Sequence, residues 1–184
     1  MEYVENETFY HINRKVAWNN NQDLRIGETY QIGKEKNPFI VFYDIANFYV
    51  ENTVDSYHRV LLEYLKMNRE IVLEEVRRES FPYLPSRYNC LWLLPNNFQA
   101  IEFWCKELEH PGKLLKLNVK GNIHSVNQKH LTTGLFNLKQ LREMAINYWE
   151  GTKHGDNPAE EEILFTGEIT VEAEYTFEEI KELM

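Results

Sequence analysis

Three consecutive glutamates, Glu160 to Glu162, stand directly before an alternating segment and are the residues best placed to do chemistry. From Ile163 to Tyr175 the odd positions are mainly apolar and the even positions mainly polar, which predicts a strand with one buried face. The same alternation, carried back, puts Glu160 and Glu162 on one side of the strand entrance and Glu161 on the other. Paired carboxylates are typical of catalytic sites. The alternative is a solvated acidic turn, because charge runs usually lie in water.

A second candidate residue lies near the start of the chain, in Phe9-Tyr10-His11-Ile12. The alternation of a short predicted strand from Thr8 to Ile12 places His11 with Phe9 on a potentially buried face. A lone histidine in such a place is more often a hydrogen-bonded core residue than a functional one.

The third candidate segment runs from Pro85 to Leu93 and contains Ser86, Arg87 and Tyr88. Prolines at positions 82 and 85 end the preceding helical pattern, and a strand is predicted from Tyr88 to Leu94.

Together, these three segments resemble the motifs of the ADP-ribosyltransferase superfamily, in that family's order. Glu160-Glu161-Glu162-Ile163-Leu164 is similar to the Glu-x-Glu-(Val/Ile)-Leu segment that opens a late core strand. The segment around His11 resembles the first-strand signature of the members that use a histidine. Pro85 to Leu93 resembles the middle segment, in which a Ser or Tyr opens a strand. The chain thus resembles an uncharacterised bacterial branch of the superfamily.

The resemblance implies an α+β fold: a split, mostly antiparallel sheet with flanking helices and NAD in the cleft between its halves. Glu162 would hold a hydroxyl of the nicotinamide ribose and stabilise the charge that develops as nicotinamide leaves, and Glu160 would contact the acceptor. The residues implied to bind the cofactor are His11, which orients it, Ser86, which supports the cleft, Arg87, which contacts the pyrophosphate, and Tyr88, which stacks on the nicotinamide ring.

The chain also departs from the family pattern. The Ser-Thr-Ser triplet of the arginine-modifying branch is absent, and neither Ser86 nor Tyr88 clearly matches the key residue of the middle motif. The identity of the acceptor, for which a protein is one candidate, therefore stays open. The competing hypothesis is a noncatalytic interaction protein that keeps the fold. A glycosidase built on two carboxylates is formally open as well.

The elements that must position these residues follow from apolar spacing. A helical face is formed by Val54, Tyr57, Leu61, Leu65, Val72 and Val76, which predicts scaffold helix over 54–79, as one helix or as two joined near Asn68. Further helices are predicted to start at Asn96 or Asn97, at Asn137, and at Thr176, which forms a capping box with Glu179. Strands are predicted over 115–119 and 122–126, whereas 39–43 fits a strand or a packed loop.

Length and composition limit the remaining possibilities. With 184 residues, of which 43% are apolar, we expect one domain over 1–184. A net charge of −9 disfavours general nucleic-acid binding, although Arg77, Arg78 and Arg87 are close enough in sequence to form a local cationic pocket for a pyrophosphate. We expect no membrane segment and no signal peptide, and hence a cytoplasmic protein.

Cysteine and histidine usage excludes other kinds of site. Cys90 and Cys105 are expected to be small buried residues rather than a disulfide. His124 and His130 are six residues apart with no cysteine nearby, so we expect no metal site.

Overall fold

The computed structural model describes residues 1–14, 23–108, 112–152 and 158–183. The fold is α+β, as predicted. Its strands are β1 (Glu2–Asn13), β2 (Thr29–Ile32), β3 (Leu91–Leu93), β4 (Lys113–Asn127) and β5 (Glu161–Tyr175). Its helices are α1 (Pro38–Ile45), α2 (Val54–Ser80), α3 (Phe98–Glu107), α4 (Leu138–Trp149) and α5 (Phe177–Leu183), with 3-10 turns η1 (Gln128–Leu131) and η2 (Pro158–Glu160).

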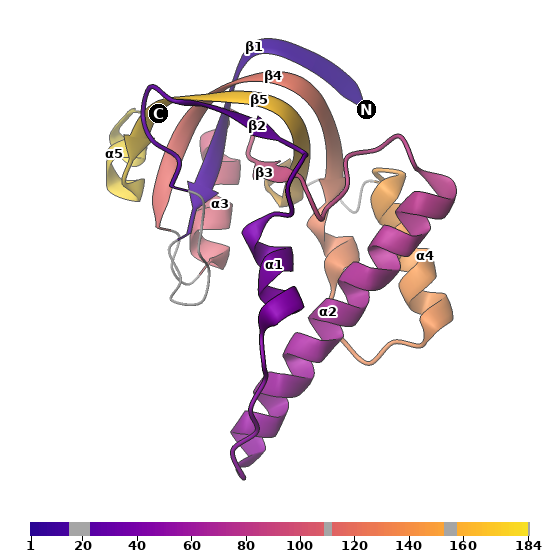
Figure 1. The fold of residues 1–184 in the computed structure, drawn as a ribbon. Coiled ribbons are helices and arrows are strands. Elements are labelled where there is room, and N and C mark those ends of the chain that lie inside the picture. The colour runs from indigo at the N-terminus through magenta and orange to yellow at the C-terminus, as the bar shows by residue number, and fades with distance from the viewer. Residues whose placement is uncertain (15–22, 109–111, 153–157, 184) are drawn as a thin grey trace.

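The strands form one antiparallel sheet that arches over the helices (Figure 1). The order is β1-β4-β5-β2, and β3 pairs with β5 on the same edge as β2, next to the first residues of β5. Tyr10 and Leu94 exchange two main-chain hydrogen bonds, of 3.0 and 2.7 Å. The end of β1 therefore meets the end of β3, and the curved sheet closes on itself at this corner.

Two glycines allow the long strands to lie very close where they bend. Gly121 of β4 is in register with Gly167 of β5. A Cβ atom on Gly121 would lie 2.3 Å from the carbonyl oxygen of Thr166, and one on Gly167 would lie 2.4 Å from that of Lys120. Only glycine fits this approach. The separate strands predicted over 115–119 and 122–126 are wrong, because β4 runs through Gly121 without a break.

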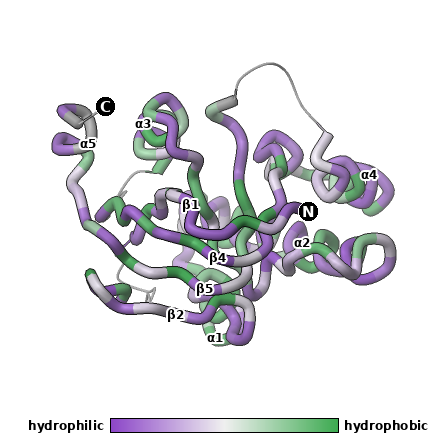
Figure 2. Tube along the Cα trace, turned by 90° about the horizontal axis from the view of Figure 1, so that it is seen from above, coloured by the Kyte–Doolittle hydropathy of each residue, from purple (hydrophilic) through white to green (hydrophobic). Residues whose placement is uncertain are grey.

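Three hydrophobic clusters fill the fold. The first lies on the face enclosed by the bent sheet and combines residues such as Phe9, Leu93, Leu117, Phe165 and Val171. The second lies on the other face, where Leu164 and Val126 pack against α2 and α4. The third packs Tyr10, Leu94 and Leu114 against Ile101 of α3. Figure 2 shows α2 and α4 on one side of the strands and α3 with α5 on the other.

Local capping signals predict the helices well. The side chains of Asn97 and Asn137 accept main-chain hydrogen bonds at the starts of α3 and α4, and Thr176 forms the predicted capping box with Glu179. α2 is one continuous helix. Both alternatives for 39–43 are wrong: this segment is α1, with Asn37 as its N-cap and Pro38 in its first turn.

Several predictions concern residues whose structure is not described. Turn-forming and polar residues predict a surface loop over 18–23 and another loop over 151–158, and Pro111-Gly112 predicts the end of the helix after Asn97. Most of the first loop, the central part of the second and Pro111 lie outside the described residues. In the described residues, no helix is both long and apolar enough to cross a membrane. Cys90 and Cys105 are free thiols, the former buried.

We predict that Gly167→Ala lowers the free energy of unfolding by at least about 3 kcal/mol, because overlap with Lys120 adds to backbone strain. Gly27→Ala is the matched control. Gly27 also has a positive φ, of 83°, but a Cβ atom there would meet nothing within 4 Å. Its cost should be about 1 kcal/mol. Urea denaturation measures the free energy of unfolding of both variants. Equal decreases would show that the close approach of β4 and β5 does not require glycine at position 167.

Candidate functional site

The middle group of predicted site residues lies in a turn between α2 and β3. The carbonyl oxygen of Ser86 accepts hydrogen bonds from the main-chain nitrogens of Asn89 and Cys90, at 3.1 and 2.9 Å. This turn occupies the residues just before β3, so the predicted strand from Tyr88 is wrong at its start: pairing with β5 begins at Leu91. Tyr88 lies in the turn, and its carbonyl accepts a hydrogen bond from the Asn37 nitrogen.

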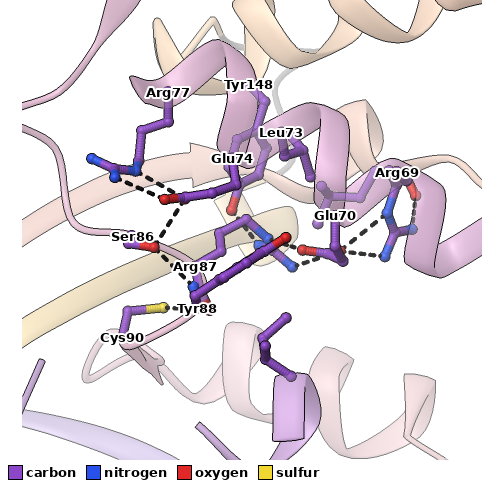
Figure 3. Close-up of polar contacts among 12 residues, drawn as sticks. Arg69, Glu70, Leu73, Glu74, Arg77, Ser86, Arg87, Tyr88, Cys90 and Tyr148 are labelled. Carbon is purple, nitrogen blue, oxygen red and sulfur yellow. Dashed lines mark hydrogen bonds and ion pairs between the residues drawn. The ribbon is translucent and has the colours of Figure 1, made fainter. Parts of the chain in front are cut away.

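Arg87 is the centre of a buried polar cluster (Figure 3). Its Nε donates to Oε2 of Glu70 at 2.8 Å, and its Nη1 donates to Oε1 of Glu162 at 2.7 Å. The same Nη1 donates to the hydroxyl of Tyr148. The guanidinium also lies over the rings of Trp92 and Tyr148, with 5.4 and 5.2 Å between its carbon and the ring centroids. Every direction around the guanidinium is thus occupied by a matching group.

The charges in this cluster balance. Arg69 also binds Glu70, at 2.8 Å, so two arginines face two carboxylates. Burial lowers the pKa of Arg87, but Glu162 and Glu70 outweigh it and hold that pKa well above its usual value. Burial raises the pKa of Glu70, but Arg87 and Arg69 outweigh it and hold that pKa below its usual range. Both groups therefore stay charged inside the protein.

A second cluster surrounds Glu74, one helical turn further along α2. Arg77 binds both carboxylate oxygens of Glu74, at 2.8 and 2.9 Å, and Arg78 binds one of them at 3.0 Å. The hydroxyl of Ser86 donates to Glu74 at 2.9 Å (Figure 3). The three arginines predicted to form a cationic pocket are therefore each paired with a carboxylate.

His11 lies on the enclosed face of the sheet. It is in register with Leu115, a member of the first cluster that Phe9 also joins. Its Nδ1 is 2.8 Å from the carbonyl oxygen of Trp92. Because a carbonyl only accepts, the neutral ring carries its proton on Nδ1. Burial lowers the pKa of His11, although the Trp92 carbonyl acts in the opposite direction, so the ring is neutral at pH 7.

The acidic run is divided between the two faces of β5. Glu162 is in register with Val126 and lies two residues before Leu164, on the same face of β5, so it points toward α2 and α4. Glu161 lies two residues before Ile163, on the same face of β5, and this face is the one that His11 shares. Glu160 is buried in η2, where Lys129 binds it at 3.0 Å. The structure thus brings Arg87 and Glu162 into contact but places His11 on the opposite face from Glu162.

Residues that sequence reasoning missed complete the cluster. Glu70 and Tyr148 hold Arg87, yet Glu70 comes from the helix predicted as scaffold, and Tyr148 comes from the helix after Asn137, for which no site residue is predicted. The sequence gives only a weak indication of Glu70: it is spaced so that it shares one side of α2 with Leu73 and Glu74. The structure shows that this side of α2 is buried. Within the described residues, no group of three His, Cys, Asp or Glu is arranged to hold a metal ion.

Two shallow hollows on the described surface lie away from these residues. One, of about 380 Å³, lies between α1 and α2 and includes Phe48 and Arg59. The other, of about 330 Å³, lies near Met1 and His124. Neither is lined by His11 or Glu162.

We predict that the protein loses stability as the pH falls below about 4.3, the unfolded-state pKa of glutamate. Glu70 and Glu74 have pKa values below the ordinary one, so their stabilisation is present above that pH and is lost as the pH falls through their folded-state pKa values. Urea unfolding at pH 7 and pH 3 measures this loss. Glu70→Gln should reduce it, whereas Glu75→Gln, on the exposed side of α2, should not. An equal pH dependence in both variants would contradict the assignment.

The chain was compared with protein-family models and with curated proteins. Among curated proteins, none matches the chain significantly. A family model described as a protein of unknown function, DUF2441, matches residues 9–182. That match spans all of the predicted site residues, from His11 in β1 to Glu162 in β5. The chain therefore belongs to the DUF2441 family.

Proposed function

We propose that this chain is a noncatalytic interaction protein, which acts by binding a partner and not by transferring ADP-ribose through Glu162. The observation that carries the proposal is the environment of the Glu162 carboxylate, whose side chain is 8% exposed and paired with Arg87 at 2.7 Å. A catalytic carboxylate must come within about 3 Å of the reacting group in a plausible substrate pose. Here that position is occupied by a guanidinium.

The energies support the same conclusion. Removing one partner of a buried ion pair costs about 3–5 kcal/mol, because the other charge is left uncompensated. One electrostatic contact to a transition state contributes about 3–4 kcal/mol. Moving Glu162 from Arg87 to a bound ribose would thus cost as much as the new contact gains. The pairing favours a structural role for Glu162.

The proposal predicts that Glu162→Gln lowers the free energy of unfolding by about 3 kcal/mol or more, because Arg87 keeps its charge and loses one of its two carboxylates. Glu161→Gln, one residue away on the other face, should change it by less than about 0.5 kcal/mol. Urea denaturation of the two variants gives both values. A Glu162→Gln protein as stable as wild type would remove the structural role and reopen the catalytic one.

A second candidate function is the NAD-dependent transfer of ADP-ribose to an acceptor, which the motif resemblance suggests. The observation in its favour is that His11 and Glu161 face the same side of the closed sheet. β3 lies between their strands, with Tyr10 bridging to Leu94 and Leu93 paired with Ile163. Two strand spacings across the sheet and the two residues from Ile163 to Glu161 along β5 amount to about 12 Å, which a nicotinamide riboside and the two side chains can bridge. In this candidate Glu161, rather than Glu162, supplies the carboxylate on the histidine side.

Nicotinamide release and thermal melting with millimolar NAD separate the two functions. The noncatalytic proposal predicts no release and no change in melting temperature, whereas NAD binding would raise the melting temperature by mass action. Release by the wild type would reject the noncatalytic proposal. A loss of about 10²–10³ in Glu161→Gln, at unchanged stability, would then support the second candidate. His11→Ala should show the same loss if the histidine orients the cofactor.

A further inference from the structure

The first half of α2 presents apolar side chains to solvent. Five of them lie along one side of the helix and are 84, 57, 46, 51 and 41% exposed: Val54, Tyr57, Leu61, Tyr64 and Ile71. The charged residues of the same stretch lie on its other sides: Asp55, Arg59, Glu63, Lys66, Arg69 and Glu70. A solvated helix has the opposite arrangement. The sequence pattern predicts Val54, Tyr57 and Leu61 as part of a scaffold face, and no described residue buries them.

The spacing of these residues is that of a coiled coil. Including exposed Asn68, the intervals from Val54 to Ile71 are three, four, three, four and three residues, which are the a and d positions of two and a half heptads. We call these six residues the α2 seam: Val54, Tyr57, Leu61, Tyr64, Asn68 and Ile71. At 1.5 Å per residue the α2 seam is about 26 Å long.

The rest of the described chain packs against other parts of α2. Tyr43 of α1 donates to Glu63 at 2.9 Å, on the side away from Leu61. Phe48 lies beside Tyr64 in a T-shaped arrangement, with 5.6 Å between the ring centroids, and leaves the Tyr64 side chain 51% exposed. α4 packs against the second half of the helix, around Val72 and Val76. In Figure 1 the first half of α2 projects beyond the sheet and the other helices.

We propose that the α2 seam binds the α2 seam of a second copy of this chain, an inference that rests on the proposed role as an interaction protein. The charge pattern points to this occupant. The seam and the flanking positions Thr53, His58, Val60, Leu65 and Met67 contain no Asp, Glu, Lys or Arg. Two copies with a net charge of −9 each can meet here without placing like charges in contact.

The residues match one another when the two helices run antiparallel. In that register Leu61 faces Tyr64 of the second copy, and Val54 faces Ile71. Tyr57 faces Asn68, so the tyrosine hydroxyl and the amide can hydrogen-bond to each other. The antiparallel direction also suits the shape of the molecule, because the sheet and α4 lie at the C-terminal end of α2 (Figure 1). The two sheets then lie at opposite ends of the helix pair.

Sedimentation of the full chain over a range of concentrations tests the pairing. We expect a dimer for the wild type and at least about 100-fold weaker association for Leu61→Glu, because it places like charges in an apolar seam. Arg59→Glu adds the same side chain on the charged side of α2 and should leave the dimer intact. Val54→Glu is a second seam variant at a highly exposed position. A wild type that stays monomeric, or equal weakening by Arg59→Glu, would overturn the inference.

Disulfide trapping tests the direction. A mixture of Tyr57→Cys and Asn68→Cys chains should form a cross-linked heterodimer, with the wild type as the control for Cys90 and Cys105. Tyr57→Cys linking to itself would overturn the antiparallel pairing. The test is separate from that of the proposed function: nicotinamide release rejects the noncatalytic role at any oligomeric state, whereas a monomeric wild type rejects only the second copy as the partner.

Discussion

The buried pairing of Arg87 with Glu70 and Glu162 is the interaction on which the positions of several elements depend. It connects the turn before β3 to the middle of α2 and to the start of β5, and Tyr148 adds α4. A buried charge is costly unless its partner lies beside it. A shift of α2, of the turn before β3 or of the start of β5 by itself would separate the charges, so these elements keep their relative positions. An apolar contact tolerates sliding, whereas bidentate geometry does not. Glu162, which belongs to the acidic run that first suggests catalysis, is therefore also a residue that holds the fold together.

The helix starts illustrate what sequence can predict, because a cap is a contact between neighbours. Asn97, Asn137 and Thr176 were found from their own local sequences. The same signal was present at Asn37-Pro38, but a helix of eight residues is too short for its apolar period to outweigh a run typical of strands. The close approach of Gly121 to Gly167 joins residues 46 positions apart, and no local rule gives it.

The sequence indicates two members of the buried cluster but neither its other members nor its arrangement. The motifs singled out Arg87 and Glu162, and the strand alternation separated Glu161 from Glu162 correctly. Neither the motifs nor the alternation indicates that Arg87 and Glu162, 75 positions apart, bind each other. Glu70 and Glu74 were hidden because charged residues on a helix ordinarily face water. For the α2 seam the period was visible, but a period does not say whether a stripe is covered by the same chain or by another.

The pairing of β1 with β4 has a consequence for how the protein forms. Glu2 is opposite Ile123, and Asn13 is opposite Lys113, so residues 14–112 separate β1 from the strand with which it pairs along its length. Contacts so distant in sequence carry a large loop-closure cost and slow the folding reaction. β4 and β5 are closer in sequence, because only residues 128–160, which include α4, separate them. During synthesis, β1 must therefore wait for its partner β4 to leave the ribosome.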